Sequence, residues 1–137
     1  MNEPAQEYKG DAVKGCPWQN KYENPQYIPA SLNSPLALKT ACMSAKHHAG
    51  VHYDLHNLYN YYEVIATRQA LIEMKKRPFI ISRATVTGFG RYGSHWTGDV
   101  FSSWSNLQAS IPNMLEFNLF GIPVVGADIC GFIDNTW

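Results

Sequence analysis

Two short apolar runs, each reached from a helix and each followed by polar residues, constrain the fold of this chain most. The runs are 79–82 (Phe-Ile-Ile-Ser) and 122–126 (Ile-Pro-Val-Val-Gly). Such runs are typical of strands buried on both faces of a parallel sheet, and in parallel barrels functional groups gather where the strands end. Because a closed barrel takes about 250 residues, we predict an α/β fold in which residues 1–137 form part of a (β/α)8 TIM barrel.

The first predicted helix covers 54–77. Asp54 can cap its start, and Pro78 after a basic run cannot continue it. Its apolar side chains recur at helical spacing and are expected to share one face: Leu55, Leu58, Tyr62, Ile65 and Ala66.

The second predicted helix begins at a cap provided by Ser102 or Ser103 and is closed by Gly121. Pro112 is expected to kink or restart it. The apolar face expected for this helix consists of Trp104, Leu107, Ile111, Met114 and Leu115.

Outside these helices and apolar runs, the sequence predicts mainly loops. Five prolines within 1–35 exclude a helix or a central strand there, and the segment is interpreted as one long excursion loop. Residues 36–45 are apolar enough for either a strand or a helix. A glycine-rich loop is expected between Arg83 and the second helix.

Composition narrows the classes of function. The chain is 45% hydrophobic and 16% charged, as in a folded domain, with 11 basic and 11 acidic residues. This balance provides no net field to attract nucleic acid or an anionic membrane, so a neutral ligand is favoured. No segment has the roughly 20 apolar residues that span a bilayer.

The glycine-rich loop joins an arginine, an aromatic residue and a carboxylate: Arg83, Trp96 and Asp99. Aromatic faces cover the apolar side of a pyranose ring, and glycosidic bonds are broken by pairs of carboxyl groups. These residues therefore indicate a sugar site. Taken alone, Asp99 could also be a turn or cap residue, and Arg83 a salt-bridge partner at the strand end.

Three ordered blocks resemble glycoside hydrolase family 31, in particular α-glucosidases of the lysosomal acid and intestinal maltase type. The blocks are 1–4 (Met-Asn-Glu-Pro), 81–99, which runs from Ile-Ser-Arg to His-Trp-Thr-Gly-Asp, and 126–132 (Gly-Ala-Asp-Ile-Cys-Gly-Phe). The resemblance runs nearly end to end. It implies a retaining hydrolase that releases glucose from nonreducing ends of maltose-like or glycogen-like α-glucosides, without a metal or other cofactor.

The resemblance also assigns roles to residues. Asp99 matches the acid/base catalyst, and Glu3 matches a glutamate beside the nucleophile with a supporting role. The nucleophile itself is expected immediately before Met1, so the chain alone is expected to be inactive. The residues that match the glucose subsite are Arg83, Trp96, Asp128 and Phe132. Without the resemblance, Trp96 and Phe132 could be core residues, and Asp128 could cap a helix.

The chain has three cysteines, an odd number that permits one bridge and one thiol with a partner elsewhere. The resemblance implies a disulfide between Cys16 and Cys42, and a partner for Cys130 beyond Trp137. A native disulfide indicates the secretory route, so we expect a lysosomal, cell-surface or extracellular protein.

Two alternatives remain open. A noncatalytic sugar-binding or structural relative would carry the same subsite without turnover, although a partial barrel is expected to need the rest of the barrel for folding. A zinc site among His47, His48, His52, His56 and Cys42 is disfavoured, because 50–51 (Gly-Val) interrupts the helix and Cys42 is assigned to the bridge. Hydrogen bonding around His52, Asp54 and Asn57 is the better interpretation.

Overall fold

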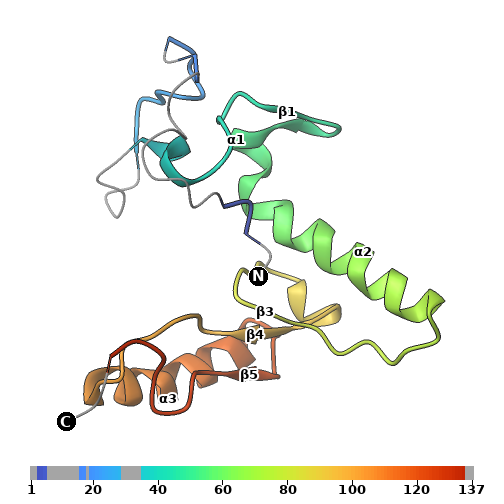
Figure 1. Ribbon diagram of the computed structural model, residues 1–137, viewed down its shortest axis with the longest axis vertical. Helices are drawn as coiled ribbons and strands as arrows, with labels where there is room; N and C mark the ends of the chain where they lie inside the picture. The colour runs from blue at the N-terminus through green and yellow to red at the C-terminus, as the bar shows by residue number, and fades with distance from the viewer. Residues whose placement is uncertain (1–2, 6–15, 18, 29–34, 135–137) are drawn as a thin grey trace. The chain divides into compact units, whose positions relative to one another are not determined.

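The computed structural model describes residues 3–5, 16–17, 19–28 and 35–134 (Figure 1). The chain divides into two compact units, one formed by Met1–Glu3 with Asn60–Trp137 and the other by Pro4–Tyr59. Among the described residues, none of the helices is both long and apolar enough to cross a membrane.

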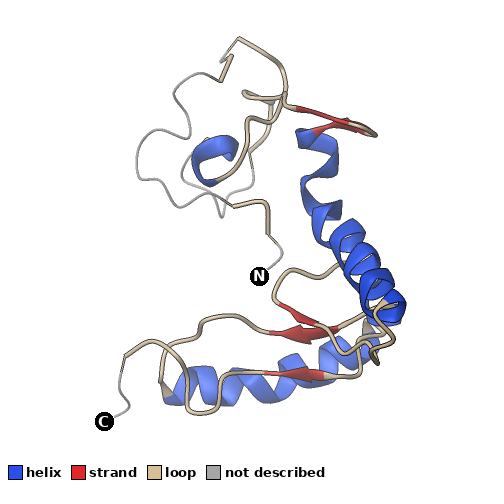
Figure 2. Cartoon of the chain, turned by 45° about the vertical axis from the view of Figure 1, so that its right-hand side comes forward, coloured by secondary structure: helices blue, strands red, loops and turns tan. Residues whose placement is uncertain are grey.

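The first unit contains a parallel sheet of three short strands in the order β3 (Ile81–Ser82), β4 (Ser94–Trp96) and β5 (Val125–Gly126). Figure 2 shows the strands side by side, with helix α3 (Trp104–Leu119) running along them. In the register, Ser82 pairs with His95, and Trp96 pairs with Gly126. The predicted parallel arrangement is therefore present, although the described residues of this unit form a sheet of three strands and no closed barrel.

A small apolar core holds this sheet to helix α2 (Tyr59–Glu73). Its fully buried members are Val64, Phe89 and Ile122, and Ile80, Tyr92 and Phe117 pack around them. Phe89 comes from the 3-10 helix η3 (Phe89–Arg91) between β3 and β4. Gly90 in η3 permits this packing, because a Cβ there would lie 1.9 Å from the Gly121 carbonyl oxygen.

Both predicted strands are found, but they are shorter than expected and one strand was missed. The prediction of a continuous loop from Arg83 to the second helix is wrong, because η3 and β4 lie within it. Strand β4 contains no run of apolar residues, and only its pairing with neighbours on both sides makes it a strand. Burial on both faces is also wrong for β3, since Ile81 is 52% exposed.

The first predicted helix begins differently. A short helix α1 (His52–Leu55) and a 3-10 turn η2 (His56–Leu58) precede α2. Asp54 lies in the first turn of α1 and does not cap it, since Val51 occupies the cap position. The buried positions of α2 are Asn60 and Val64. The predicted apolar face is therefore wrong: its members Leu58 and Tyr62 are exposed, at 39% and 57%.

Helix α2 ends at Glu73 through its own hydrogen bonds and not at Pro78. The Lys76 N–H donates to the Leu71 carbonyl at 2.8 Å, and the Lys75 N–H donates to the Ile72 carbonyl at 2.9 Å. Lys75 adopts the left-handed conformation with φ 56°. This is the Schellman motif, which normally has glycine at that position.

Helix α3 follows its predicted ends. The Ser103 hydroxyl accepts a hydrogen bond from the Asn106 N–H at 3.2 Å, and Gly121 ends the helix with φ 80°. Pro112 lies inside α3, which continues through it without restarting. The predicted apolar face is exposed, and most of its members have more than half of their surface accessible: Trp104, Leu107, Ile111 and Leu115. Phe117 makes the packing contact with the core instead.

The second unit contains a 3-10 helix η1 (Leu36–Lys39), the antiparallel hairpin β1 (Lys46–His47) and β2 (Gly50–Val51), and the turns α1 and η2. The segment 36–45, for which strand and helix both remained possible, thus contains a 3-10 helix. The described residues before Pro35 contain no helix or extended strand, only a bridge between Ala5 and Thr40, as expected of the excursion loop.

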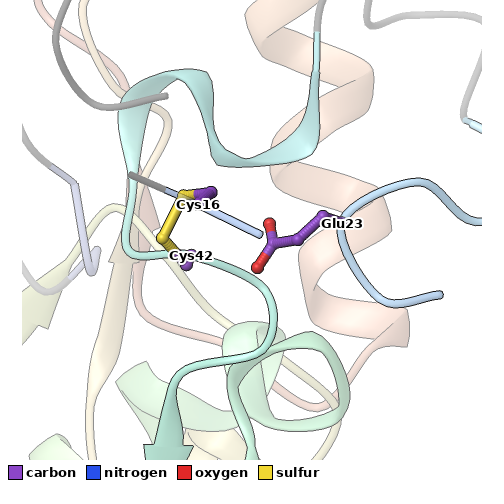
Figure 3. Close-up of side chains that lie close together, drawn as sticks. All are labelled: Cys16, Glu23 and Cys42. Carbon is purple, nitrogen blue, oxygen red and sulfur yellow. A yellow bond between two sulfur atoms is a disulfide. The ribbon is translucent and has the colours of Figure 1, made fainter. Parts of the chain in front are cut away.

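A disulfide joins Cys16 and Cys42, with Cα atoms 5.5 Å apart, as the resemblance implied. Figure 3 shows Glu23 beside this bridge. Two cysteines and a glutamate this close together could hold a metal ion, but the two sulfurs are bonded to each other. The Glu23 carboxylate is also engaged, because it accepts hydrogen bonds from the Met43 and Ser44 amides and from the Ser44 hydroxyl. Burial raises the Glu23 pKa, but these bonds outweigh it and the pKa is lowered.

His52 is 1% exposed and lies at the centre of a chain of hydrogen bonds. Its Nδ1 lies 3.0 Å from Nε2 of His47, and its Nε2 lies 2.9 Å from Nδ1 of His56 and 3.1 Å from the hydroxyl of Thr40. Because the Thr40 hydroxyl donates to the Pro4 carbonyl, its oxygen accepts from His52 Nε2–H. His52 Nδ1 then accepts from His47. Structural hydrogen bonding around His52 is therefore present, as expected, and its partners in these contacts are His47, His56 and Thr40.

Lys75→Gly is predicted to stabilise the protein by about 1 kcal/mol, because glycine adopts the left-handed conformation of a helix end without a steric penalty. Urea unfolding at equilibrium measures the change. Lys75→Ala is the matched control: it removes the same charge and keeps the penalty. A gain in Lys75→Ala equal to that in Lys75→Gly would attribute the effect to charge and contradict the backbone argument.

The second unit is predicted to lose stability as the pH falls from 6.5 to about 4. Burial, together with the nearby His56 and His47, lowers the pKa of His52 from 6.5 to about 4. As the pH falls, the unfolded chain therefore binds a proton at His52 before the folded protein does. The contribution of neutral His52 to stability is complete above pH 6.5 and is lost as the pH falls toward its folded pKa of about 4. It amounts to roughly 3 kcal/mol.

Thermal unfolding of the wild type and of His52→Gln between pH 7.5 and 4 tests this prediction. Glutamine cannot take up a proton, so the difference in unfolding free energy between the two proteins is expected to shrink as the pH falls. A difference that stays constant over this range would show that His52 titrates equally in both states.

Candidate active site

Arg83, directly after β3, lies between two of the predicted catalytic carboxylates. Its Nε lies 2.5 Å from Oε1 of Glu3, and its Nη1 lies 3.7 Å from Oδ2 of Asp99. All three side chains are partly exposed, between 24% and 36%. The structure thus brings Glu3 and Asp99 together around one guanidinium, although they are far apart in the sequence.

This arrangement keeps both members of the Glu3–Arg83 pair charged. Burial raises the pKa of Glu3, but the hydrogen bond from Arg83 and its positive charge outweigh this and lower the pKa overall. The same hydrogen bond raises the pKa of Arg83, with the charges of Glu3 and Asp99 adding to it. A glutamate held ionised in this way is a poor proton donor, which agrees with a supporting role for Glu3.

Gly98 allows the loop after β4 to pass close to Arg83. It has φ +87°, and a Cβ at this position would lie 2.7 Å from Cδ of Arg83. The Thr97 N–H holds the loop to β5 by donating to the Gly126 carbonyl at 3.1 Å. The glycine before Asp99 is therefore required both by the backbone conformation and by the space that the arginine occupies.

Trp96 and Asp128 form the second part of the site. The indole N–H of Trp96 donates to Oδ1 of Asp128 at 2.7 Å, and the Arg83 guanidinium lies 5.8 Å from the centre of the indole ring. Oδ2 of Asp128 is buried and has no hydrogen-bond partner within the described part of the chain. A buried carboxylate oxygen without a partner is costly, so a ligand hydroxyl there would relieve a penalty.

Phe132, the remaining predicted subsite residue, is placed differently. Its backbone N–H donates to the Val100 carbonyl at 2.8 Å, which holds it next to the segment that carries Asp99. Its side chain is 67% exposed, and no ring contact with the other candidate residues occurs in the described parts. The structure brings together five of the six candidates by side-chain contacts and Phe132 by its backbone alone.

Sequence reasoning did not single out His95, which directly precedes the candidate residue Trp96. His95 is 8% exposed and lies in β4 directly before Trp96. Its Nδ1 lies 3.2 Å from the Thr85 hydroxyl, and its ring stacks on Phe117 with centroids 3.8 Å apart. Burial lowers its pKa, while a hydrogen bond to the backbone of Arg83 opposes this. The only sequence signal for His95 was its position at the start of the His-Trp-Thr-Gly-Asp block, and a position in a motif does not show whether a histidine is buried.

The purely structural roles considered for these residues in the sequence analysis are partly correct. Arg83 is a salt-bridge partner at the strand end, as the alternative held, and the same contacts place it between the two carboxylates. Asp128 uses its side chain to bind the Trp96 indole. Chemically, the site combines charged hydrogen-bonding groups with an aromatic face, which are the groups that recognise sugar hydroxyls and pyranose rings.

Trp96→Phe is predicted to cost about 1–3 kcal/mol of stability, because it leaves both oxygens of the Asp128 carboxylate, of which Oδ2 is buried, without a protein partner. Urea unfolding measures the loss. The matched background is Asp128→Ala, in which Trp96→Phe is expected to cost much less. Equal costs in the two backgrounds would mean that the hydrogen bond contributes nothing and that only ring packing is lost.

Comparison with known proteins identifies the family of the chain. The family model for the glycosyl hydrolases family 31 TIM-barrel domain matches residues 1–137. The chain is 50% identical to bovine lysosomal alpha-glucosidase over 137 residues, which is 99% of this chain and 14% of that protein. It is 47% identical to alpha-xylosidase 1 of Arabidopsis thaliana over 118 residues, which is 83% of this chain and 13% of that protein.

A solved structure shows the same local fold. The glucosidase II alpha subunit, crystallised with a bound alpha3-Glc2 ligand, matches with a TM-score of 0.68 and 38% identity, over 72% of this chain and 11% of that one. The chain thus spans about one seventh of the length of the first relative and about one ninth of the subunit. Matched over its whole length by the family model and at high identity by its relatives, the chain belongs to glycosyl hydrolases family 31, within the TIM-barrel domain.

Proposed function

We propose that these 137 residues are a segment of the catalytic barrel of a retaining α-glucosidase, which releases glucose from the nonreducing ends of α-linked oligosaccharides. The observation that supports this most is the placement of Arg83 between Glu3 and Asp99, beside the Trp96–Asp128 pair. The relatives named above, an alpha-glucosidase and the alpha subunit of glucosidase II, support the activity.

In the proposed reaction, Asp99 protonates the leaving oxygen and then removes a proton from the incoming water. The nucleophile expected in this family would directly precede Met1, so the reaction requires a protein in which this segment is joined to that residue. Retention needs the two carboxyl groups about 5 to 5.5 Å apart. Arg83 would keep the charge of Asp99 compensated in the ionised state that the second step requires.

The proposed substrate is an α-glucoside such as maltose or an outer chain of glycogen. Trp96 offers an aromatic face to the sugar, and the unpartnered Oδ2 of Asp128 is an acceptor for a hydroxyl. Because the chain is also similar to a protein named alpha-xylosidase 1, the preference for glucose over xylose is the part of the proposal that the test must check.

We also propose that the protein follows the secretory route and needs the remainder of the barrel to fold. The disulfide between Cys16 and Cys42 supports an oxidising compartment, as does the similarity to lysosomal alpha-glucosidase. The apolar side chains exposed on α3, on β3 and just before β3 support the need for further barrel elements: Phe79, Ile81, Trp104, Ile111 and Leu115. Surfaces of this kind are normally covered.

Asp99→Asn, made in the complete barrel that contains this segment, is predicted to lower kcat/KM about 10²- to 10⁴-fold for natural disaccharides and much less for aryl α-glucosides. An activated aryl leaving group departs without protonation, so it needs the general acid least. Initial rates with maltose and with 4-nitrophenyl α-glucoside measure both effects. Asp54→Asn is the matched control, because Asp54 is an exposed carboxylate of the second unit.

An equal loss for both substrates would contradict the acid/base role of Asp99. Binding of maltose by a wild-type protein that hydrolyses neither substrate would replace the proposal with the noncatalytic sugar-binding alternative. Faster turnover of the aryl xyloside than of the aryl glucoside would overturn the choice of glucose and keep the hydrolase.

A further inference from the structure

We propose that His95 is a positioning residue that fixes the segment 83–85 and thereby holds the Arg83 guanidinium between Glu3 and Asp99. The effect on catalysis rests on the proposed function, whereas the effect on the position of Arg83 does not. His95 is a buried histidine that the proposed reaction does not use, and its polar contacts are directed toward the segment that carries Arg83.

The backbone of His95 is rigid because it lies in the central strand of the sheet. It pairs with Ser82 of β3 on one side and with Val125 of β5 on the other, and its N–H donates to the Val124 carbonyl at 3.0 Å. The ring stacks on Phe117 of α3, with an interplanar angle of 19°. Both the backbone and the ring plane of His95 are therefore set by elements other than the Arg83 segment.

The segment that His95 contacts has little regular structure of its own. Residues 83–88 belong to no helix or strand, and η3 begins only at Phe89. His95 meets this segment at two points, through the Thr85 hydroxyl at 3.2 Å and through the backbone of Arg83. An imidazole between these points limits the conformations of the backbone from which the Arg83 side chain extends.

The groups facing the ring favour its neutral form. Burial is the largest influence and lowers the pKa, and the hydrogen bond to the Arg83 backbone only partly offsets it. Phe117 and Thr85 carry no charge. A neutral imidazole offers one donor and one acceptor without adding a second positive charge near the guanidinium. This explains why a histidine can serve at this position where a lysine or an arginine would disturb the ion pairs.

The decisive variant is His95→Phe in the complete barrel, because phenylalanine keeps a ring to stack on Phe117 and lacks both polar contacts. We expect kcat for an aryl α-glucoside to fall about 10- to 100-fold, with KM changed less than about 3-fold, because a misplaced guanidinium disturbs the carboxylates more than the aromatic subsite. In the crystal structure of the variant, Arg83 Nε is expected to have left Glu3. His95→Asn, which keeps an amide near the Nδ1 position, should recover most of the loss.

Val64→Ala is the matched control for stability. Val64 lies in the apolar core against which Phe117 packs and is not one of the candidate site residues, so its truncation should lower the unfolding free energy and leave kcat within about 2-fold. If His95→Phe does not fold, Thr85→Val replaces it, since this variant removes one of the two contacts without altering the ring. It is expected to lower kcat in the same direction.

Arg83 remaining on Glu3 in the His95→Phe crystal, or kcat losses in His95→Phe and Val64→Ala that follow stability alone, would overturn the positioning role. A wild-type barrel that hydrolyses no α-glucoside would overturn the proposed function instead. In that case, the position of Arg83 in the two crystal structures still decides the role of His95.

Discussion

The parallel pairing of β4 with both of its neighbours is the constraint on which the site depends. Parallel strands end at the same edge of a sheet, so the residues that follow them become neighbours in space although they are far apart in the sequence. Ser82 pairs with His95, and Trp96 pairs with Gly126. In consequence Arg83, Trp96 and Asp128 emerge at one edge. A slip of one residue in this register would turn Trp96 to the opposite face and break its bond to Asp128.

At this edge the charges are arranged unequally around one guanidinium. Arg83 makes a hydrogen-bonded ion pair with Glu3 and a longer contact of 3.7 Å with Asp99. The shorter pair lowers the pKa of Glu3 and keeps that carboxylate ionised. The contact between Arg83 and Asp99 is the longer of the two, and in the proposed reaction Asp99 is the carboxylate that transfers the proton.

The sequence predicted the parts of this structure that depend on local chemistry. Ser103 caps α3 and Gly121 ends it, because the capping hydroxyl and the left-handed glycine act within a few residues. It missed β4, whose three residues have no apolar pattern and form a strand only through their neighbours. It also misplaced the packing face of α2, because apolar residues at helical spacing do not show which side of a helix tertiary contacts will bury, and here they bury Val64.

For the candidate site, the motif blocks identified six residues, and the geometry adds the interactions that a motif cannot supply. The spacing of Trp96 and Asp128 does not predict a hydrogen bond between them, since 32 positions separate the two. Gly98 is conformationally required only once the Arg83 side chain is known to lie against it. Phe132 shows the reverse case, in which a motif position is present and its ring lies outside the contacts of the site.

The two buried histidines illustrate why burial alone does not reveal a role. His52 and His95 are both almost inaccessible, and burial is the leading cause of a lowered pKa in each. His52 is bonded to two further imidazoles and a threonine, so its neutral form stabilises a local network. The His95 ring stacks on the ring of Phe117, and its Nδ1 contacts Thr85 in the segment that carries Arg83, an arginine of the candidate site. The two histidines therefore differ in the groups that their rings contact. For His95, those contacts follow from the pairing of β4 with its neighbouring strands.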